Sequence, residues 1–190
     1  MRASKFPLVL IFVFFVLIPG LVCPVWAQNF DSLQSRYLTL RNTDVTLKKS
    51  EEWIRLAKDF ETFADKNQRA IEAVHAIFNA AIVYAELHKA TKDDKYIENA
   101  LSHFESIPRD FPGNKFADDA LLKAGDIYVL TLNDEDKAKH RYLEIIDAYP
   151  DSEMVAVARI RLKRLKDGEP ILGTSEQSVP SSRLPLVIID

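Results

Sequence analysis

The chain has 190 residues, of which 47% are hydrophobic and 28% are charged, a composition that can fill a packed core and argues against wholesale disorder. Only five glycines are present, which argues against an all-β or loop-rich chain. The formal net charge of −3 gives the protein no general attraction for nucleic acid.

Residues 1–27 have the organisation of a secretory signal peptide. Arg2 and Lys5 provide the positive start, and an apolar run over residues 6–18 follows them. We expect cleavage after Ala27, which would release the mature chain into the periplasm without a stable membrane span. An uncleaved membrane anchor is the alternative, but the apolar run is shorter than the ~20 residues that a spanning helix needs.

Cys23, the only cysteine, lies within this predicted leader. A lipoprotein signal needs a small residue before the acylated cysteine, and Val22 stands there instead. Cleavage after Ala27 would leave a chain without cysteine, which rules out disulfides and thiolate metal sites in the mature protein. The mature chain would carry 23 basic and 28 acidic residues, because the leader contains two basic residues and no acid.

From Phe30 to about Lys166, apolar residues recur at spacings of three and four, and proline is expected only at breaks. The spacing predicts an all-α domain over residues 28–167. In its last helix, Val155, Ala158, Leu162 and Leu165 form an apolar stripe. Five basic residues lie off this stripe, and we expect a solvated face, with a patch for an anionic polymer as the alternative: Arg159, Arg161, Lys163, Arg164 and Lys166.

Internal similarity is the strongest pattern in the helical region. The segments 104–112 and 142–150 each open with an aromatic residue and close with an aromatic-proline pair, and an earlier unit fits with an offset of 44 instead of 38. Alanine lets two helices approach closely, and proline ends the first helix of a unit. The matched positions are Leu56/Ala100/Ala138, Phe60/Phe104/Tyr142, Ala76/Ala120/Ala158, Ala80/Ala124 and Tyr84/Tyr128.

Helix starts are predicted from capping residues. Asp151 or Ser152 can cap the last helix, and Asn133 followed by three acids marks another start. The pairs Asp93-Asp94 and Asp118-Asp119 also fall at helix starts, where the helix dipole favours acids.

These units resemble tetratricopeptide repeats over most of Ser50 to Lys166. The resemblance implies an α-solenoid of helix-turn-helix pairs with a groove that binds a protein partner in the cell envelope. The offsets exceed the usual ~34 residues, so we expect longer helices or wider loops. A generic helical bundle is the alternative.

The composition changes after Asp167. Residues 168–183 are rich in Ser, Pro and Gly and are expected to form a linker, whereas residues 184–190 are an apolar, β-branched run typical of a buried strand. A strand is not stable alone. We therefore expect residues 184–190 to begin a further domain that is truncated here.

The order of leader, helical repeats, linker and strand resembles exported zinc-dependent N-acetylmuramoyl-L-alanine amidases. Their catalytic domain opens with a strand like Val187-Ile188-Ile189-Asp190, and the helix over residues 116–128 also resembles their helical region. The resemblance implies that zinc-activated water cleaves the bond between muramic acid and the stem peptide. The zinc-binding histidine would follow Asp190, so zinc and peptidoglycan contacts are expected only in the missing domain.

The sequence therefore assigns no catalytic, cofactor-binding or metal-binding residue to this chain. The alternative function is a stand-alone periplasmic adaptor for outer-membrane assembly or for coordination of the cell wall with the envelope. In that case residues 184–190 would be a binding tail or a strand added to a partner's sheet.

The histidines and Trp53 could in principle bind a metal or a sugar, but packing or surface roles explain them better. Glu72 and His75 have the spacing of a di-iron motif, but no second copy exists, so His75 is expected to be a surface or packing residue. His103 and His140 are expected on exposed flanks, and Trp53 in the core. His88 is the fourth histidine, and no nucleophile elbow or phosphate loop is present.

Overall fold

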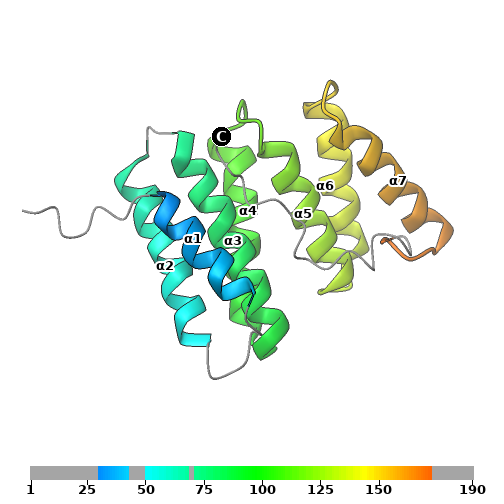
Figure 1. The fold of residues 1–190 in the computed structure, drawn as a ribbon. Helices are drawn as coiled ribbons and strands as arrows, with labels where there is room; N and C mark the ends of the chain where they lie inside the picture. Colours follow the sequence, from blue (N-terminus) through cyan, green and yellow to red (C-terminus); the bar gives the residue numbers. More distant parts are fainter. Residues whose placement is uncertain (1–29, 43–49, 69–70, 173–190) are drawn as a thin grey trace, which may run out of the picture.

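The computed structural model describes residues 30–42, 50–68 and 71–172, and in this part the chain forms seven α-helices and no strand (Figure 1). The predicted all-α fold is therefore confirmed. The predicted leader (1–27) and strand (184–190) lie outside the described residues, as does the linker beyond residue 172. The helices are α1 (Phe30–Arg41), α2 (Ser50–Lys66), α3 (Ile71–Thr91), α4 (Asp94–Asp110), α5 (Ala117–Leu130), α6 (Glu135–Ala148) and α7 (Met154–Asp167).

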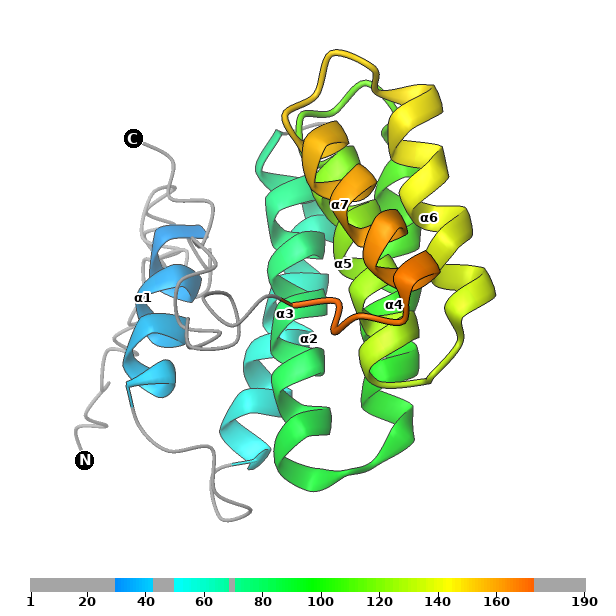
Figure 2. The same ribbon diagram turned by 90° about the vertical axis from the view of Figure 1, so that its right-hand side faces the viewer.

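Helices α2 to α7 form three successive hairpins, α2/α3, α4/α5 and α6/α7, stacked in chain order (Figures 1 and 2). The second helix of a hairpin also packs on the first helix of the next, so α3 contacts α4 and α5 contacts α6. Helix α1 precedes the first hairpin and packs on α2 through Phe30, whose ring meets those of Phe60 and Phe63. This is the predicted repeat arrangement.

The repeated sequence positions form the core of the stack. The matched alanines are fully buried, and so are the matched aromatic residues Phe60, Phe104 and Tyr142. Small side chains at the crossings let the helices approach closely, and one large ring per unit fills the space beside them. The sequence similarity between the units therefore reflects one helix-packing arrangement that occurs three times.

The two unequal offsets follow from helix length. Helix α3 has 21 residues, whereas its counterpart α5 has 14. The first offset of 44 exceeds the second of 38 by about this difference. A longer helix, one of the two expected causes, thus explains why the first offset exceeds the second.

A capping residue is found at one predicted helix start and displaced at another. Asp134 caps α6 by accepting the Lys137 N–H at 3.0 Å. The N-cap of α7 is Glu153, which makes no side-chain cap bond, and Ser152, one residue earlier, accepts the Met154 N–H at 2.9 Å. Phe111 and Tyr149 are the C-cap residues of α4 and α6, and a proline follows each of them. The aromatic-proline pairs therefore end the first helix of a unit, as predicted.

One expectation about proline is wrong, because Pro108 lies inside α4 rather than at a break. Proline has no N–H, so the Phe104 carbonyl loses its partner four residues on. The position is in the last turn, where the Phe111 N–H still bonds to the Ile107 carbonyl at 2.8 Å. A helix end tolerates this loss better than a helix centre.

The expectation of a solvated basic face on α7 is wrong at Arg161, and Arg164 is only partly exposed, because it also donates to the Ile171 carbonyl. Arg161 is only 4% exposed. Its Nε donates to Oδ1 of Asp126 at 3.1 Å, and its Nη1 donates to the Ile171 carbonyl at 2.7 Å. Gly168 ends α7 with a φ of 66°, and the following residues bring Ile171 over Arg161. The helical period alone could not reveal this covering segment.

Gly125 offers a direct test of the close packing in the stack. A Cβ at this position would lie 2.5 Å from Cε1 of the fully buried Tyr142. We expect Gly125→Ala to lower the free energy of unfolding in urea by about 1–3 kcal/mol, even though alanine favours a helix over glycine by ~1 kcal/mol.

Gly113→Ala is the matched control, because nothing lies within 4 Å of a Cβ there. Its free energy of unfolding should change by less than about 0.5 kcal/mol. A Gly125→Ala protein as stable as the parent, or more stable, would contradict the described approach of α5 and α6.

Candidate functional site

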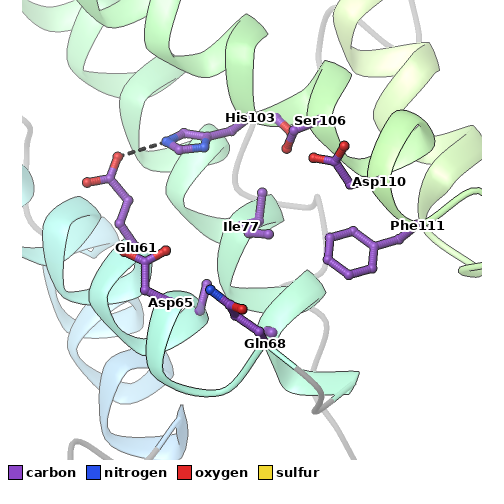
Figure 3. A pocket seen from close by; sticks show the side chains of 10 residues that line it. Glu61, Asp65, Gln68, Ile77, His103, Ser106, Asp110 and Phe111 are labelled. Atoms are coloured by element: carbon purple, nitrogen blue, oxygen red, sulfur yellow. Dashed lines mark hydrogen bonds and ion pairs between the residues drawn. The ribbon is translucent and has the colours of Figure 1, made fainter.

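A pocket with a volume of about 400 Å³ opens between α2 and α4, with α3 as its floor (Figure 3). Its apolar lining comes from Ala64, Ala73, Ile77 and Phe111. The polar lining contains three carboxylates and no lysine or arginine: Glu61, Asp65, Gln68, His103, Ser106 and Asp110. The pocket is thus an acidic depression with an apolar floor.

Glu61 ties the three helices of the pocket together. The Tyr84 hydroxyl on α3 donates to its Oε1 at 2.9 Å, and Nε2 of His103 on α4 lies 2.8 Å from the same oxygen. The hydrogen bond with His103 is the main cause that lowers the pKa of Glu61, against the opposing effect of burial. Burial, followed by the Glu61 carboxylate, raises the pKa of Tyr84.

The expectation that His103 lies on an exposed flank is wrong. Its side chain is 25% exposed, and its ring stacks on Tyr84 with centroids 5.7 Å apart. The reason is the glutamate on the neighbouring helix, which the sequence position of His103 does not reveal. Figure 3 shows the imidazole directed at the carboxylate of Glu61.

The same arrangement recurs one unit later. The Tyr128 hydroxyl donates to Oε1 of Glu105 at 2.8 Å, and Nε of Arg141 donates to that oxygen at 3.0 Å. Glu105 and Tyr128 follow Glu61 and Tyr84 by 44 residues, and Arg141 follows His103 by 38. We call each such set a clamp: a tyrosine and a glutamate of one unit with a nitrogen-bearing side chain of the next, which is His103 or Arg141. Neither clamp was predicted from the sequence, although the repeat offsets applied to polar positions would have found both.

A third polar contact joins the last three helices. Asp126 of α5 accepts from the Tyr142 hydroxyl of α6 at 2.8 Å and from Arg161 of α7. Burial, and then the Asp126 carboxylate, raises the pKa of Tyr142. Each pair of neighbouring repeat units is thus joined by hydrogen bonds to a shared carboxylate.

The acids at the start of α5 lie in its first turn, as expected. Asp118 also accepts a hydrogen bond from the Ser152 hydroxyl, which links α5 to the start of α7. Burial, and then the negative charge of Asp118, raises the pKa of Asp119 to about 6. Asp118 thus has a structural role in holding the last hairpin.

The remaining candidates are structural. His75 is 2% exposed, and its ring packs between Phe30 and Phe116 at centroid distances of 6.0 and 4.7 Å, so the packing role is confirmed. Trp53 is buried and His140 is exposed, both as expected. His88 lies 3.2 Å from the Asp93 carbonyl at the turn between α3 and α4.

Two further kinds of feature are absent from the part of the chain that the structure describes. No group of three or more His, Cys, Asp or Glu side chains there could hold a metal ion. None of the described helices is both long enough and apolar enough to cross a membrane.

The family model of the tetratricopeptide repeat matches residues 119–152, from the first turn of α5 through α6 to the turn before α7. No curated protein and no solved structure shows significant similarity to the chain. The match and the stacked hairpins together identify an all-helical repeat fold. Repeats of this kind indicate a protein-interaction region.

His75 predicts a pH dependence of stability. Burial, and next the positive charge of Lys115, lowers its pKa below the ordinary 6.5, while Glu72 opposes them. The unfolded chain therefore binds a proton more readily than the folded chain once the pH falls below 6.5, and stability is lost there. We expect His75→Leu to remove this loss, so its free energy of unfolding should improve relative to the parent between pH 7 and pH 5.

Urea denaturation at each pH measures the difference between the two proteins. Asp119 acts in the opposite direction, because its pKa is raised when folded, but it is present in both proteins and cancels. The difference should be constant between pH 7 and pH 8. A difference that is also constant down to pH 5 would contradict the assigned environment of His75.

Proposed function

We propose that the chain is an exported protein-interaction scaffold of the cell envelope, which holds a segment of a protein partner in the pocket between α2 and α4. The observation that carries the proposal is the pocket itself, an open, concave site formed by two successive repeat units. Residues 1–27 support export, because they have the charge and apolar pattern of a signal peptide.

The residues of the pocket also suggest a hydrolytic function, but their hydrogen bonds do not fit one. Glu61, His103 and Ser106 are the residue types of a nucleophilic triad and line one pocket. However, the Ser106 hydroxyl donates to the His103 backbone carbonyl at 2.8 Å, and Nε2 of the imidazole is taken by Glu61. A serine nucleophile needs a hydrogen bond to its base, so binding is the better-supported function.

The parent protein is proposed to be a cell-wall amidase, for which these helices would provide docking without chemistry. The order of leader, helical repeats, Ser/Pro-rich segment and Val187-Ile188-Ile189-Asp190 supports this proposal. The alternative is a stand-alone envelope adaptor that uses the same pocket.

The nucleotide sequence that follows codon 190 separates these two proposals. An open frame that continues with Pro-Gly-His-Gly is expected for the amidase. A natural stop codon would count against the amidase, and the adaptor would then be favoured. The adaptor also predicts that deletion of residues 168–190 abolishes partner capture, whereas the amidase predicts that capture survives.

Site-specific photocrosslinking tests binding at the pocket. The crosslinker benzoylphenylalanine is introduced in living cells at Gln68, on the rim of the pocket, or at Lys163, an exposed position on α7. We expect a discrete adduct with one envelope protein at position 68 and none at position 163. Equal adducts at both positions, or none at either, would contradict the proposed docking site.

A further inference from the structure

The two clamps make an internal comparison possible. Offsets of 44 and 38 superpose the pocket on an equivalent set of residues from α4, α5 and α6, which we call the second site. Glu61 corresponds to Glu105, and His103 corresponds to Arg141; a nitrogen of each lies 2.8 Å from its glutamate. The comparison therefore aligns side chains that make the same contacts, not merely the same sequence positions.

The second site holds larger side chains than the pocket. Pro108 replaces Ala64, Glu144 replaces Ser106, and Arg141 replaces His103. The Arg141 guanidinium lies between two carboxylates, 2.8 Å from Glu105 and 2.8 Å from Glu144. A cation of this chain thus occupies the second site.

The pocket has space and unsatisfied negative charge instead. The small side chains of Ala64 and Ser106 contribute to its volume of about 400 Å³. Asp65 and Asp110 stand where the second site has Arg109 and Ala148. Figure 3 places Asp65 on the side of Glu61 and Asp110 on the side of Phe111, so carboxylates flank both ends of the pocket.

The two carboxylates differ in their partners. Among the described residues Asp65 has no ion pair. Asp110 accepts two hydrogen bonds from its neighbour Arg109, at 2.9 and 3.0 Å, so its charge is already paired within the chain. Asp65 is therefore the carboxylate that is available to an incoming cation.

From this comparison we infer that the pocket binds an arginine side chain of the partner polypeptide, followed or preceded by an apolar residue. The inference rests on the proposed function and specifies the chemistry of the partner. A guanidinium can pair with the Asp65 carboxylate, while its alkyl stem covers the apolar floor at Ile77 and Phe111. The partner arginine would thus add the positive charge that the second site draws from Arg109, the counterpart of Asp65, and from Arg141.

Selection of random peptides tests the inference. Phage-displayed dodecapeptides are selected on the purified full chain, and the enriched peptides are synthesised with a fluorophore for affinity measurement. We expect enrichment of arginine beside an apolar residue, and affinities that weaken as NaCl rises from about 50 to about 500 mM, since ion pairs at an open site are screened.

Three double variants assign the binding to the pocket. His103→Arg with Ser106→Glu places the side chains of the second site in the pocket and fills its space. The formal charge is unchanged, because one positive and one negative charge are added and histidine is counted as neutral. Asp65→Asn with Asp110→Asn keeps the space and removes the charge. Each should weaken the enriched peptides at least ~10-fold. Glu135→Gln with Asp136→Asn, at the start of α6, removes the same charge elsewhere and should leave the affinity within about twofold.

The outcomes separate the inference from the proposed function. One outcome is enrichment of peptides without arginine whose binding is nonetheless abolished by His103→Arg with Ser106→Glu. That result would overturn the inference and leave the docking site standing. Peptides with lysine but no arginine, or with acidic residues, would count as this result. Peptides that bind the filled variant as well as the parent, or a selection that enriches nothing, would overturn both. Circular dichroism and thermal melting of each variant ensure that lost binding reflects the pocket and not unfolding.

Discussion

A glutamate that receives hydrogen bonds from two neighbouring helices is the interaction on which the stack depends. Alanine-lined helix surfaces permit close approach but specify rotation poorly, because a methyl group makes few directional contacts. Glu61 and Glu105 orient the helices, since Oε1 of each contacts a tyrosine of its own unit and a nitrogen of the next, from His103 or Arg141. Partly buried polar groups with partners on two helices favour one arrangement over its near alternatives. The clamps thus fix the register between units, and apolar burial provides most of the stability.

The same interaction explains why the chain has a pocket at one junction and a filled site at the other. The contacts of the glutamate are alike at both, but the surrounding side chains differ in size and charge. At the second junction Arg141 also donates to Glu144 and fills the site from within the chain. At the first junction the His103 imidazole contacts Glu61, and the space beside the smaller Ser106 stays open. The pocket thus lies at the junction that carries the smaller side chains.

The buried apolar residues could be predicted from the sequence, whereas most polar contacts between helices could not. Residues such as Ala76, Phe104 and Tyr142 repeat at fixed offsets, and burial follows from that repetition together with the helical period. Glu61 and His103 each look like ordinary surface residues when considered alone, because their partners lie 23 to 42 positions away. Arg161 was placed in solvent because the helical period cannot reveal the segment at Ile171 that covers it. The pocket depends on small size differences between equivalent side chains of the two junctions. A pattern of apolar and polar residues does not contain this information.

A double-mutant cycle between Glu105 and Arg141 tests the central claim most directly. The free energies of unfolding of the parent, Glu105→Gln, Arg141→Gln and the double variant give the coupling between the two side chains without the effects that each change has alone. A clamp that fixes the register between α4 and α6 predicts a coupling of about 1 kcal/mol or more, above the usual value for an exposed ion pair. A coupling close to zero would mean that apolar packing alone aligns the repeat units, which would contradict a register fixed by the clamps.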